Sequence, residues 1–505
     1  MNKIDNFLNR ITMYRLVLNY LIILLMVAVI YSVFDLLPYS PIALIVSILV
    51  LIWFSLLTEK VYSKVYNAQT NTESVYITAL ILVFLISPAQ SINDIFFLMW
   101  VGILAEASKY ILAINKKHIF NPAAIAIVLT SVAANQSASW WIGNMYMMPF
   151  VVIGGLLIVR KIRREEMVNT FIMTMVITTL IFSLFVHQDL LNQIKNITLY
   201  SSIWFLGFVM LTEPLTTPST KILQMIYGGI VGFLMVPQLH FGAIYFSPEL
   251  ALVLGNVFVY IVSPKEKLIL KLKEKVKLSE DIYDFVFDKP KSFTFSPGQY
   301  MEWTLGHNEV DSSGNRRYFT LVSSPTEDTI RIGIKFRQHV TSYKRTLLQM
   351  EPNSEIIASQ LAGDFTLPKD KNRKLVFIAG GIGITPFRSI LKYLIDSNEK
   401  RDIILLYCNK FIEEIVYTEI FNEAQKQLKI KTIYTLTNER SIPLAWEGKI
   451  GRINRQMIID EIPDYRDRLY YISGPHAMVE GFKGTLQKLG IKNGQIIKDY
   501  FPGFV

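Results

Sequence analysis

The chain has 505 residues, of which 51% are hydrophobic and 18% charged, and its formal net charge is +10 at pH 7. Its single cysteine, Cys408, excludes an intrachain disulfide and an iron–sulfur cluster held by four cysteines. Because the Lys and Arg residues bracket apolar stretches, we assign the positive charge to a lipid surface and expect no nucleic-acid partner. We also expect no metal site.

Ten apolar stretches fill the first half of the chain, and a membrane-spanning helix needs roughly 20 such residues. The stretches lie near 14–37, 40–57, 75–89, 95–112, 120–134, 146–160, 169–186, 198–212, 222–237 and 246–263. Several are short, so nine to eleven spans are compatible with the pattern. The first is too long for a cleavable signal peptide. We therefore predict a polytopic α-helical membrane domain of about ten transmembrane helices over residues 1–263.

The positive residues between these stretches are unevenly distributed. If the N-terminus is cytoplasmic, the inner loops or their edges hold the Lys and Arg residues of 60–64, 116–117, 160–164 and 221, whereas the outer loops hold only Lys195. Cytoplasmic loops are enriched in Lys and Arg. We therefore expect a multi-pass protein of the plasma membrane, with the N-terminus and the second half of the chain in the cytoplasm.

Two segments interrupt the apolar pattern at the expected cytoplasmic side. In KKHIFNPAA (116–124), Asn121 can cap a helix that begins at Pro122. LTEPLTTPST (211–220) contains Glu213, two prolines and five hydroxyl residues. Irregular backbone at membrane depth is tolerated only against protein or a cavity. By spacing alone, ordinary capped loops explain both segments equally well.

A further acid, Glu106, lies within the stretch 95–112. Charged residues inside spans are costly and are often functional, so an ion path is one explanation. A salt bridge to Lys109, three residues later, is the simpler one.

The second half of the chain changes character. Short alternating runs over 264–370 predict an antiparallel β-barrel domain: LILKLKEKVKLS, YDFVFDK, QYMEWTL, YFTLVSSP and IRIGIKF. Over 371–505, the apolar runs KLVFIAGG, DIILLYC and IKTIYTLT alternate with helical stretches, which favours a parallel α/β sheet. A short linker near Pro264 joins this half to the first.

Four motifs of this half, in order, are RRYFT (316–320), GGIGITP (380–386), SGPHAM (473–478) and a terminal DYFPGF. A glycine run between a strand and a helix lets a pyrophosphate approach the backbone and the helix N-terminus. A guanidinium suits the pyrophosphate of a flavin nucleotide. Each motif alone also fits a plain turn or strand, and their order and spacing as a set carry the prediction.

Together the motifs resemble the ferredoxin–NADP reductase superfamily over nearly all of 265–505. The resemblance implies an NAD(P)H-dependent FAD oxidoreductase. It assigns Arg317, Phe319 and Thr320 to the flavin motif and Thr341 and Ser342 to the helix start that meets the FAD phosphates. It assigns Gly380, Gly381, Gly383 and Thr385 to the nicotinamide-nucleotide loop, and Ser473 and Gly474 to the nicotinamide. Phe501 matches the terminal aromatic over the flavin, with Tyr500 and Phe504 as rivals. The catalytic roles fall to Thr320, Ser473 and Phe501.

The choice between NADH and NADPH stays open. Lys410 could hold a 2′-phosphate, whereas Glu413 and Glu414 would oppose one and favour NADH.

The first half also carries a resemblance, through KYILAINKKHIFNPAA and LTEPLTTPST. It is similar to the membrane subunits shared by the Rnf electron-transport complex and the sodium-translocating NADH:quinone oxidoreductase. Those subunits have ten helices, bind flavin and take part in redox-driven ion transfer, which implies FMN or riboflavin in this half. The family's Ser-Gly-Ala-Thr-like FMN attachment segment does not occur in this sequence, which argues against covalent FMN.

The combined hypothesis is a membrane flavoprotein that passes electrons from NAD(P)H through FAD to a flavin, a quinone or a partner protein. Asn121 and Glu213 would form the membrane-side acceptor site, and coupling to ion transport is part of the expectation. Two other classes compete. A ferric-reductase or NADPH-oxidase type enzyme would need paired membrane histidines, but the first half has only His118, His187 and His240. A redox-regulated transporter is the third class.

Overall fold

The computed structural model describes residues 4, 7–8, 11–66, 72–114, 117–236, 239–242, 244–263, 267–307, 310–311, 314–336, 340–439 and 442–499. The chain divides into two compact units. Ile11–Lys267 form one, here called the helical unit, and Leu268–Val505 together with Met1–Arg10 form the other, the sheet unit. The linker expected near Pro264 lies outside the described residues.

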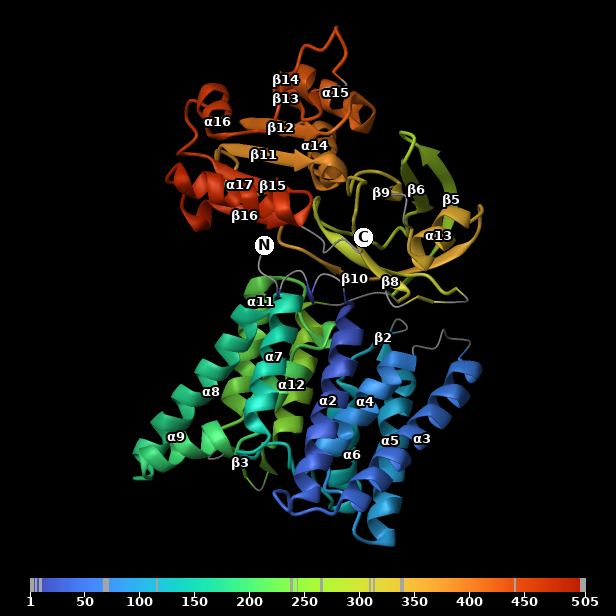
Figure 1. The fold of residues 1–505 in the computed structure, drawn as a ribbon, viewed down its shortest axis with the longest axis vertical. Coiled ribbons are helices and arrows are strands. Elements are labelled where there is room, and N and C mark those ends of the chain that lie inside the picture. Colours follow the sequence, from blue (N-terminus) through green and yellow to red (C-terminus); the bar gives the residue numbers. More distant parts are fainter. Residues whose placement is uncertain are drawn as a thin grey trace. The chain divides into compact units, whose positions relative to one another are not determined.

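The helical unit is a bundle of helices (Figure 1) with two short hairpins. Its helices are α2 (Met13–Val33), α3 (Pro41–Val65), α4 (Thr72–Leu85), α5 (Ile92–Ile111), α6 (Pro122–Ala134), α7 (Met148–Ile162), α8 (Glu165–Phe185), α9 (Leu190–Leu199), α10 (Ile203–Phe205), η1 (Leu206–Met210), η2 (Pro214–Thr216), α11 (Lys221–Leu234) and α12 (Pro248–Val262). The hairpins pair β1 (Ala113–Ile114) with β2 (Lys117–His118), and β3 (His240–Phe241) with β4 (Ile244–Tyr245).

The expectation of about ten membrane-length helices is wrong. Among the described residues, three helices are long and apolar enough to cross a membrane by length and composition: α2, α3 and α8. The apolar helices α4, α6, α11 and α12 have 13 to 15 residues. Helix starts shorten two of them, since Asn121 and Ser247 cap α6 and α12 and a proline follows each cap. The stretch 198–212 splits among the end of α9, α10 and η1.

Glycines allow α8 and α11 to pack backbone to backbone. A Cβ on Gly228 would lie 2.4 Å from the carbonyl oxygen of Met167, and one on Gly232 would lie 2.4 Å from that of Phe171. Side chains would hold these two helices apart, so small residues are required at both positions.

The sheet unit contains a six-stranded antiparallel sheet in the order β8-β7-β10-β5-β6-β9. Its strands are β5 (Leu268–Lys277), β6 (Ile282–Asp288), β7 (Tyr300–Thr304), β8 (Arg316–Thr320), β9 (Thr329–Lys335) and β10 (Glu355–Ala362), with helix α13 (Ser342–Gln349) beside them. Alternating apolar side chains such as Leu270, Phe285 and Ile332 form its core around the fully buried Trp303. The predicted antiparallel strands are confirmed.

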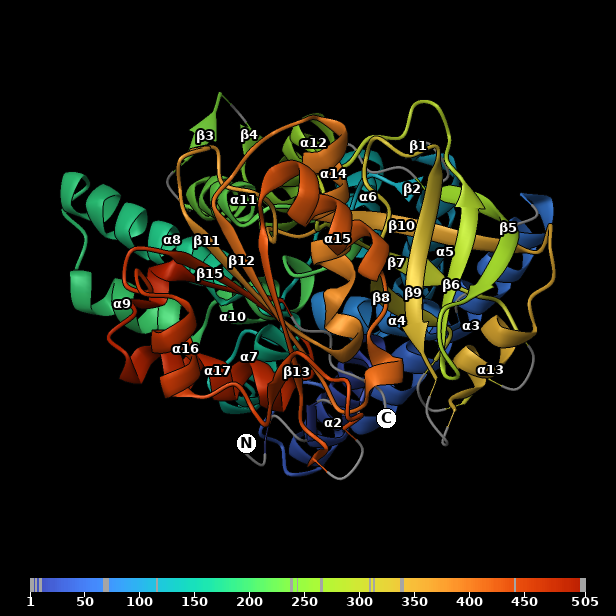
Figure 2. The same cartoon turned by 90° about the horizontal axis from the view of Figure 1, so that it is seen from above.

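The second sheet is parallel throughout, in the order β14-β13-β12-β11-β15-β16. Its strands are β11 (Leu375–Gly380), β12 (Ile403–Asn409), β13 (Lys431–Leu436), β14 (Lys449–Ile450), β15 (Leu469–Ser473) and β16 (Ile496–Asp499). Helices α14 (Thr385–Asp396) and α15 (Thr418–Leu428) cover one face, and α16 (Arg455–Glu461) and α17 (His476–Lys488) cover the other (Figure 2). Both faces are buried, which explains the continuous apolar runs in the sequence. The predicted domain boundary at 370/371 falls in an exposed stretch before β11.

Candidate functional site

Arg317 joins two of the predicted flavin motifs. It lies on β8, is only 6% exposed, and its Nη2 is 3.5 Å from the hydroxyl of Thr341, the residue that caps α13. Its guanidinium carbon lies 5.0 Å above the ring of Tyr343. Burial lowers the pKa of this guanidinium, although the group stays charged at neutral pH. A buried cation beside a helix N-terminus is an arrangement that fits a pyrophosphate.

The start of α13 already has an anionic partner. The N–H of Ser342 donates to Oδ2 of Asp311 at 2.7 Å, and the hydroxyl of Ser342 lies 3.0 Å from Nε2 of His307. Carboxylates and phosphates are stabilised by the same exposed N–H groups. Asp311 therefore stands where the predicted phosphate contact of Ser342 would form, and the sequence analysis did not identify it.

Phe319 and Thr320 occupy the end of β8, next to β7. The ring of Phe319 lies 6.2 Å from that of Tyr343, and Thr320 is buried opposite Tyr300. Alternation along the strand places Arg317 and Phe319 on one face and Thr320 on the other. One aromatic and one hydroxyl thus meet at a strand end, as the flavin motif requires.

The predicted nicotinamide residues converge at the carboxyl ends of two neighbouring parallel strands. Gly380 and Gly381 end β11, Ser473 ends β15, and these strands pair directly. A Cβ on Gly383 would lie 2.5 Å from both Cα of Gly474 and the carbonyl oxygen of Ser473. Ligands of parallel α/β sheets bind at this edge, where a glycine turn opens a helix.

Two backbone positions show why glycine is required there. Gly381 has φ of +54°, and a Cβ on it would meet no atom within 4 Å, so its constraint is conformational. A Cβ on Gly380 would instead lie 2.1 Å from Sδ of Met478, a residue that the sequence analysis named only within a motif. Thr385 begins α14 and is buried.

The acids proposed to oppose NADPH are not equivalent. Oε1 of Glu414 forms an ion pair of 2.7 Å with Lys335, and its Oε2 accepts the N–H of Lys410 at 3.2 Å. Glu413 and the side chain of Lys410 are exposed. With Glu414 engaged, the argument that acids outnumber the base loses one of its two acids. Phe501 and its rivals Tyr500 and Phe504 lie outside the described residues.

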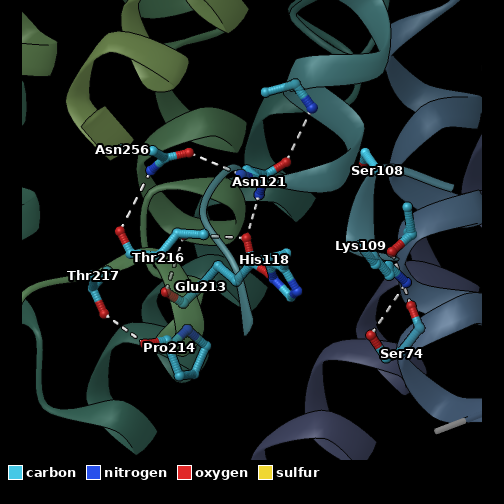
Figure 3. Close-up of polar contacts among 12 residues, drawn as sticks. Ser74, Ser108, Lys109, His118, Asn121, Glu213, Pro214, Thr216, Thr217 and Asn256 are labelled. Atoms are coloured by element: carbon cyan, nitrogen blue, oxygen red, sulfur yellow. Dashed lines mark hydrogen bonds and ion pairs between the residues drawn. The ribbon is translucent and has the colours of Figure 1, made fainter. Parts of the chain in front are cut away.

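In the helical unit, Asn121 and Glu213 are direct partners, although 92 residues separate them. Nδ2 of Asn121 donates to Oε2 of Glu213 at 2.8 Å, while Oε1 of Glu213 lies 3.2 Å from Nε2 of His118 (Figure 3). The hydroxyl of Thr216 reaches Oε2 at 3.2 Å. The two irregular segments therefore form one polar cluster, here called the Glu213 cluster.

Asn256 completes this cluster from α12, and the sequence analysis missed it. Its Oδ1 accepts the N–H of Asn121 at 2.8 Å, and its Nδ2 lies 3.4 Å from the carbonyl oxygen of Thr216 and 3.1 Å from the hydroxyl of Tyr227 (Figure 3). Asn256 is fully buried. Its signal was available, since it is a lone amide in the apolar stretch 246–263, and polar residues in such stretches are often functional.

A π-helix leads into the cluster. The N–H of Leu211 donates to the carbonyl oxygen of Leu206 at 2.8 Å, and this i→i+5 bond closes η1 two residues before Glu213. Single π-turns occur frequently at functional sites.

Comparison with known proteins covers the sheet unit. Residues 377–484 match the model of the oxidoreductase NAD-binding domain family. The chain is 28% identical over 244 residues to a flavohemoprotein of Oceanobacillus iheyensis, covering 46% of this chain and 58% of the relative. It is 25% identical over 223 residues to the glycine betaine monooxygenase reductase subunit of Pseudomonas aeruginosa, covering 43% and 60%. The match thus spans well under two thirds of these relatives.

Among solved structures, a flavohemoglobin from Malassezia yamatoensis with bound FAD and heme aligns with a TM-score of 0.44 and 20% identity, over 59% of this chain and 73% of that one. The FAD/NAD-binding domain of a Vibrio cholerae nitric oxide dioxygenase aligns with a TM-score of 0.41 and 20% identity, over 46% and 98%. The family match, the related sequences and the motifs agree. The C-terminal half of the chain is a ferredoxin–NADP reductase-like module, an NAD(P)H-dependent oxidoreductase that binds FAD.

Proposed function

We propose that the whole chain is a membrane flavoprotein reductase that passes electrons from NAD(P)H through FAD to an acceptor held at the Glu213 cluster. The observation that carries this proposal is the direct contact of Asn121 with Glu213, because it unites two polar segments inside an apolar helical unit. Structural loops would need only local caps, whereas four separate segments contribute to this cluster.

The surface of the helical unit supports a bilayer environment. Large apolar side chains are exposed along its three long helices, among them Ile30 on α2, Trp53 on α3 and Met173 on α8. Soluble proteins rarely expose apolar surface on this scale. We place the unit in the plasma membrane, with the N-terminus and the reductase module in the cytoplasm, from the distribution of Lys and Arg. The resemblance to the flavin-binding membrane subunits of the Rnf complex and of the sodium-translocating oxidoreductase agrees with that placement.

The reductase module would divide its work among three groups. The glycines at 380–383 and 474 let the nucleotide backbone approach the sheet edge, and the small Ser473 leaves room for a nicotinamide ring. Arg317 and the start of α13 hold the flavin pyrophosphate, and the Thr320 hydroxyl would face N5 of the flavin. When bound, FAD accepts a hydride and releases electrons one at a time.

The Glu213 cluster fits a ring that carries both hydrogen-bond donors and acceptors, such as a flavin or a quinone head group. Glu213 offers acceptor oxygens, and the Asn121 amide and the His118 ring offer polar contacts on the same side. FMN or riboflavin is the implied occupant for a flavin, and a partner protein is the other route for electrons.

Ion coupling is not part of this proposal. Glu106 is fully buried, but Lys109 pairs with its Oε1 at 2.8 Å and also contacts Ser74 at 3.5 Å (Figure 3). The salt bridge accounts for the buried acid without an ion path.

The test uses the purified full-length protein. Asn121→Leu and Glu213→Gln should leave NAD(P)H-dependent ferricyanide reduction unchanged and abolish reduction of duroquinone, a neutral quinone probe. Asn192→Leu, on the exposed face of α9, is the matched control. If both cluster variants reduce duroquinone at the normal rate, the acceptor site lies elsewhere.

An absorbance spectrum of the same preparation separates the competing classes. Flavin bands alone support the proposal, whereas a Soret band would identify a haem-containing transmembrane reductase. The structure gives the haem alternative no pair of helical histidines among its described residues, because His118 and His240 lie on hairpins and His187 follows α8. A redox-regulated transporter would show substrate flux without electron transfer.

A further inference from the structure

The largest described cavity lies at the opposite end of the helical unit from the Glu213 cluster. Its volume is about 610 Å³, within the range of small-molecule sites. It is bounded by the turns at 36–39, 139–146 and 200–202, by α9 and by the middle of α8. Asn121 begins α6, and the turn at 139–146 follows the end of that helix, so the two sites face opposite ends of the bundle (Figure 1).

The lining of this cavity is aromatic and uncharged. Tyr39, Trp140, Trp141, Tyr146 and Tyr200 contribute rings, and no Asp, Glu, Lys, Arg or His belongs to the described lining. Taking an ion from water into a neutral site is costly unless a partner charge is present. The cavity therefore selects against charged ligands such as phosphates and carboxylates.

Polar groups in the lining are hydroxyls and amides. Asn196 and Gln193 project from α9, and Ser201 and Ser202 from the neighbouring turn. Amide N–H and hydroxyl groups donate hydrogen bonds to carbonyl oxygens. Rings combined with such donors suit a planar ring that carries carbonyl acceptors.

The wall of the cavity holds a strained residue in place. Trp140 has φ of +48°, a left-handed conformation that is unusual for a bulky side chain. Its N–H donates to the carbonyl oxygen of Leu85 at 2.9 Å, and its indole N–H donates to the buried carboxylate of Glu249 at 3.0 Å. Strain of this kind persists where surrounding contacts fix it, and it clusters at ligand sites.

We propose that this cavity binds a neutral quinone head group from the membrane. The choice of a quinone rather than another neutral ring rests on the proposed membrane reductase function, since a quinone is the neutral ring that such an enzyme would meet in a bilayer. Tyr200, half exposed at the cavity mouth, provides a ring face, and Asn196 provides a donor.

Binding is measured on the oxidised full-length protein in nanodiscs, without NAD(P)H, so the result is independent of the electron route. Duroquinone is the probe, and empty nanodiscs are subtracted. We expect saturable binding by the wild type and no binding of the anionic anthraquinone-2-sulfonate. Tyr200→Ala should weaken duroquinone binding roughly two- to tenfold through loss of a stacking face. Tyr245→Ala, which removes an exposed tyrosine outside the lining, should leave it unchanged.

A charge provides a second, independent variant in case Tyr200→Ala misfolds. Asn196→Asp places a carboxylate at the cavity, whereas Asn192→Asp adds the same charge to the same helix outside the lining. Only the former should weaken binding. The proposal is overturned if wild-type protein binds no more duroquinone than empty nanodiscs do, or if either pair of variants binds equally well. Normal binding together with wild-type activity of the Asn121 and Glu213 variants would reject the proposed acceptor site alone.

Discussion

The hydroxyl of Tyr417 donates a hydrogen bond of 2.6 Å to Oδ1 of Asp284, and both side chains are buried. The contact ties the start of α15, beside the parallel sheet, to β6 of the antiparallel sheet. A Cβ on Gly333 would lie 2.5 Å from the Tyr417 hydroxyl, so the neighbouring strand β9 leaves room for this contact only through glycine. Nearby, Nη2 of Arg388 pairs with Oε1 of Glu327 at 3.0 Å and links the same two sheets.

Asp284 should give the protein a pH-dependent stability. Burial raises the pKa of its carboxyl to about 6, although Tyr417, Arg388 and Arg331 oppose that rise. In the unfolded chain the pKa is about 3.9. Between those values the folded state binds more protons, so this group's contribution to the free energy of unfolding falls as pH rises from about 4 to about 6.

Replacing the carboxyl isolates this contribution. Asp284→Asn can still accept the Tyr417 hydrogen bond but cannot ionise. The wild-type melting temperature should therefore drop more than that of the variant between pH 4.5 and pH 7, in thermal unfolding of the full-length protein. Parallel curves for the two proteins would show that Asp284 does not titrate in this window.

Arg317→Ala should release FAD from the purified protein. The substitution removes the buried cation that contacts both Thr341 and Tyr343, and hydrogen bonds to charged groups contribute about 1.5–3 kcal/mol. A loss of that size weakens flavin affinity roughly 10- to 100-fold. Flavin content per protein, from absorbance after gel filtration, measures the effect. Arg373→Ala, in the turn before β11, is the control, and full retention of FAD would remove Arg317 from the site.

Gly383→Ala should slow flavin reduction by NAD(P)H while leaving bound FAD in place. The new methyl group would overlap the Gly474 backbone and separate the two glycine turns at the sheet edge. Stopped-flow absorbance of the flavin reports the rate. Gly481→Ala is the matched control, because a Cβ on that glycine meets nothing within 4 Å. Equal rates in the two variants would contradict a nucleotide role for this turn.

Gly228→Ala should destabilise the helical unit, whereas Gly229→Ala should not. The first methyl group would meet the Met167 carbonyl at 2.4 Å, but the second would meet only side-chain atoms of α8 at 3.8 Å. Overpacking of a close contact typically costs about 1–3 kcal/mol. Thermal aggregation of the two variants in one detergent compares them directly, and identical midpoints would show that α8 and α11 separate without cost.

Much of the sheet unit could be predicted from local pattern. Alternation specified β6 and β9, and a glycine run between a strand and a helix located the edge where Gly383 meets Gly474. Such features depend on neighbours in sequence. The Asp311 contact with Ser342 could not be predicted, because a loop acid at a helix start leaves no periodic signal.

The helical unit was harder to predict. Hydropathy measures apolar composition but not helix length, so it counted ten stretches where capping residues and the irregular segments interrupt the helices. Asn121 and Glu213 were identified separately as polar residues in apolar surroundings. Their contact with each other and with Asn256 depends on how α6, η2 and α12 pack, which no single segment specifies.

The π-turn at Leu206–Met210 makes the position of Glu213 depend on the number of residues before it. An i→i+5 turn holds one residue more than an α-helical turn would. Deleting one residue within it would restore α-helical phase and rotate everything that follows by about 100° about the helix axis. Glu213 would then turn away from His118 and Asn121, although none of these three side chains had been altered. The acid's orientation is thus set by chain length, and a one-residue deletion would act as a substitution at a distance.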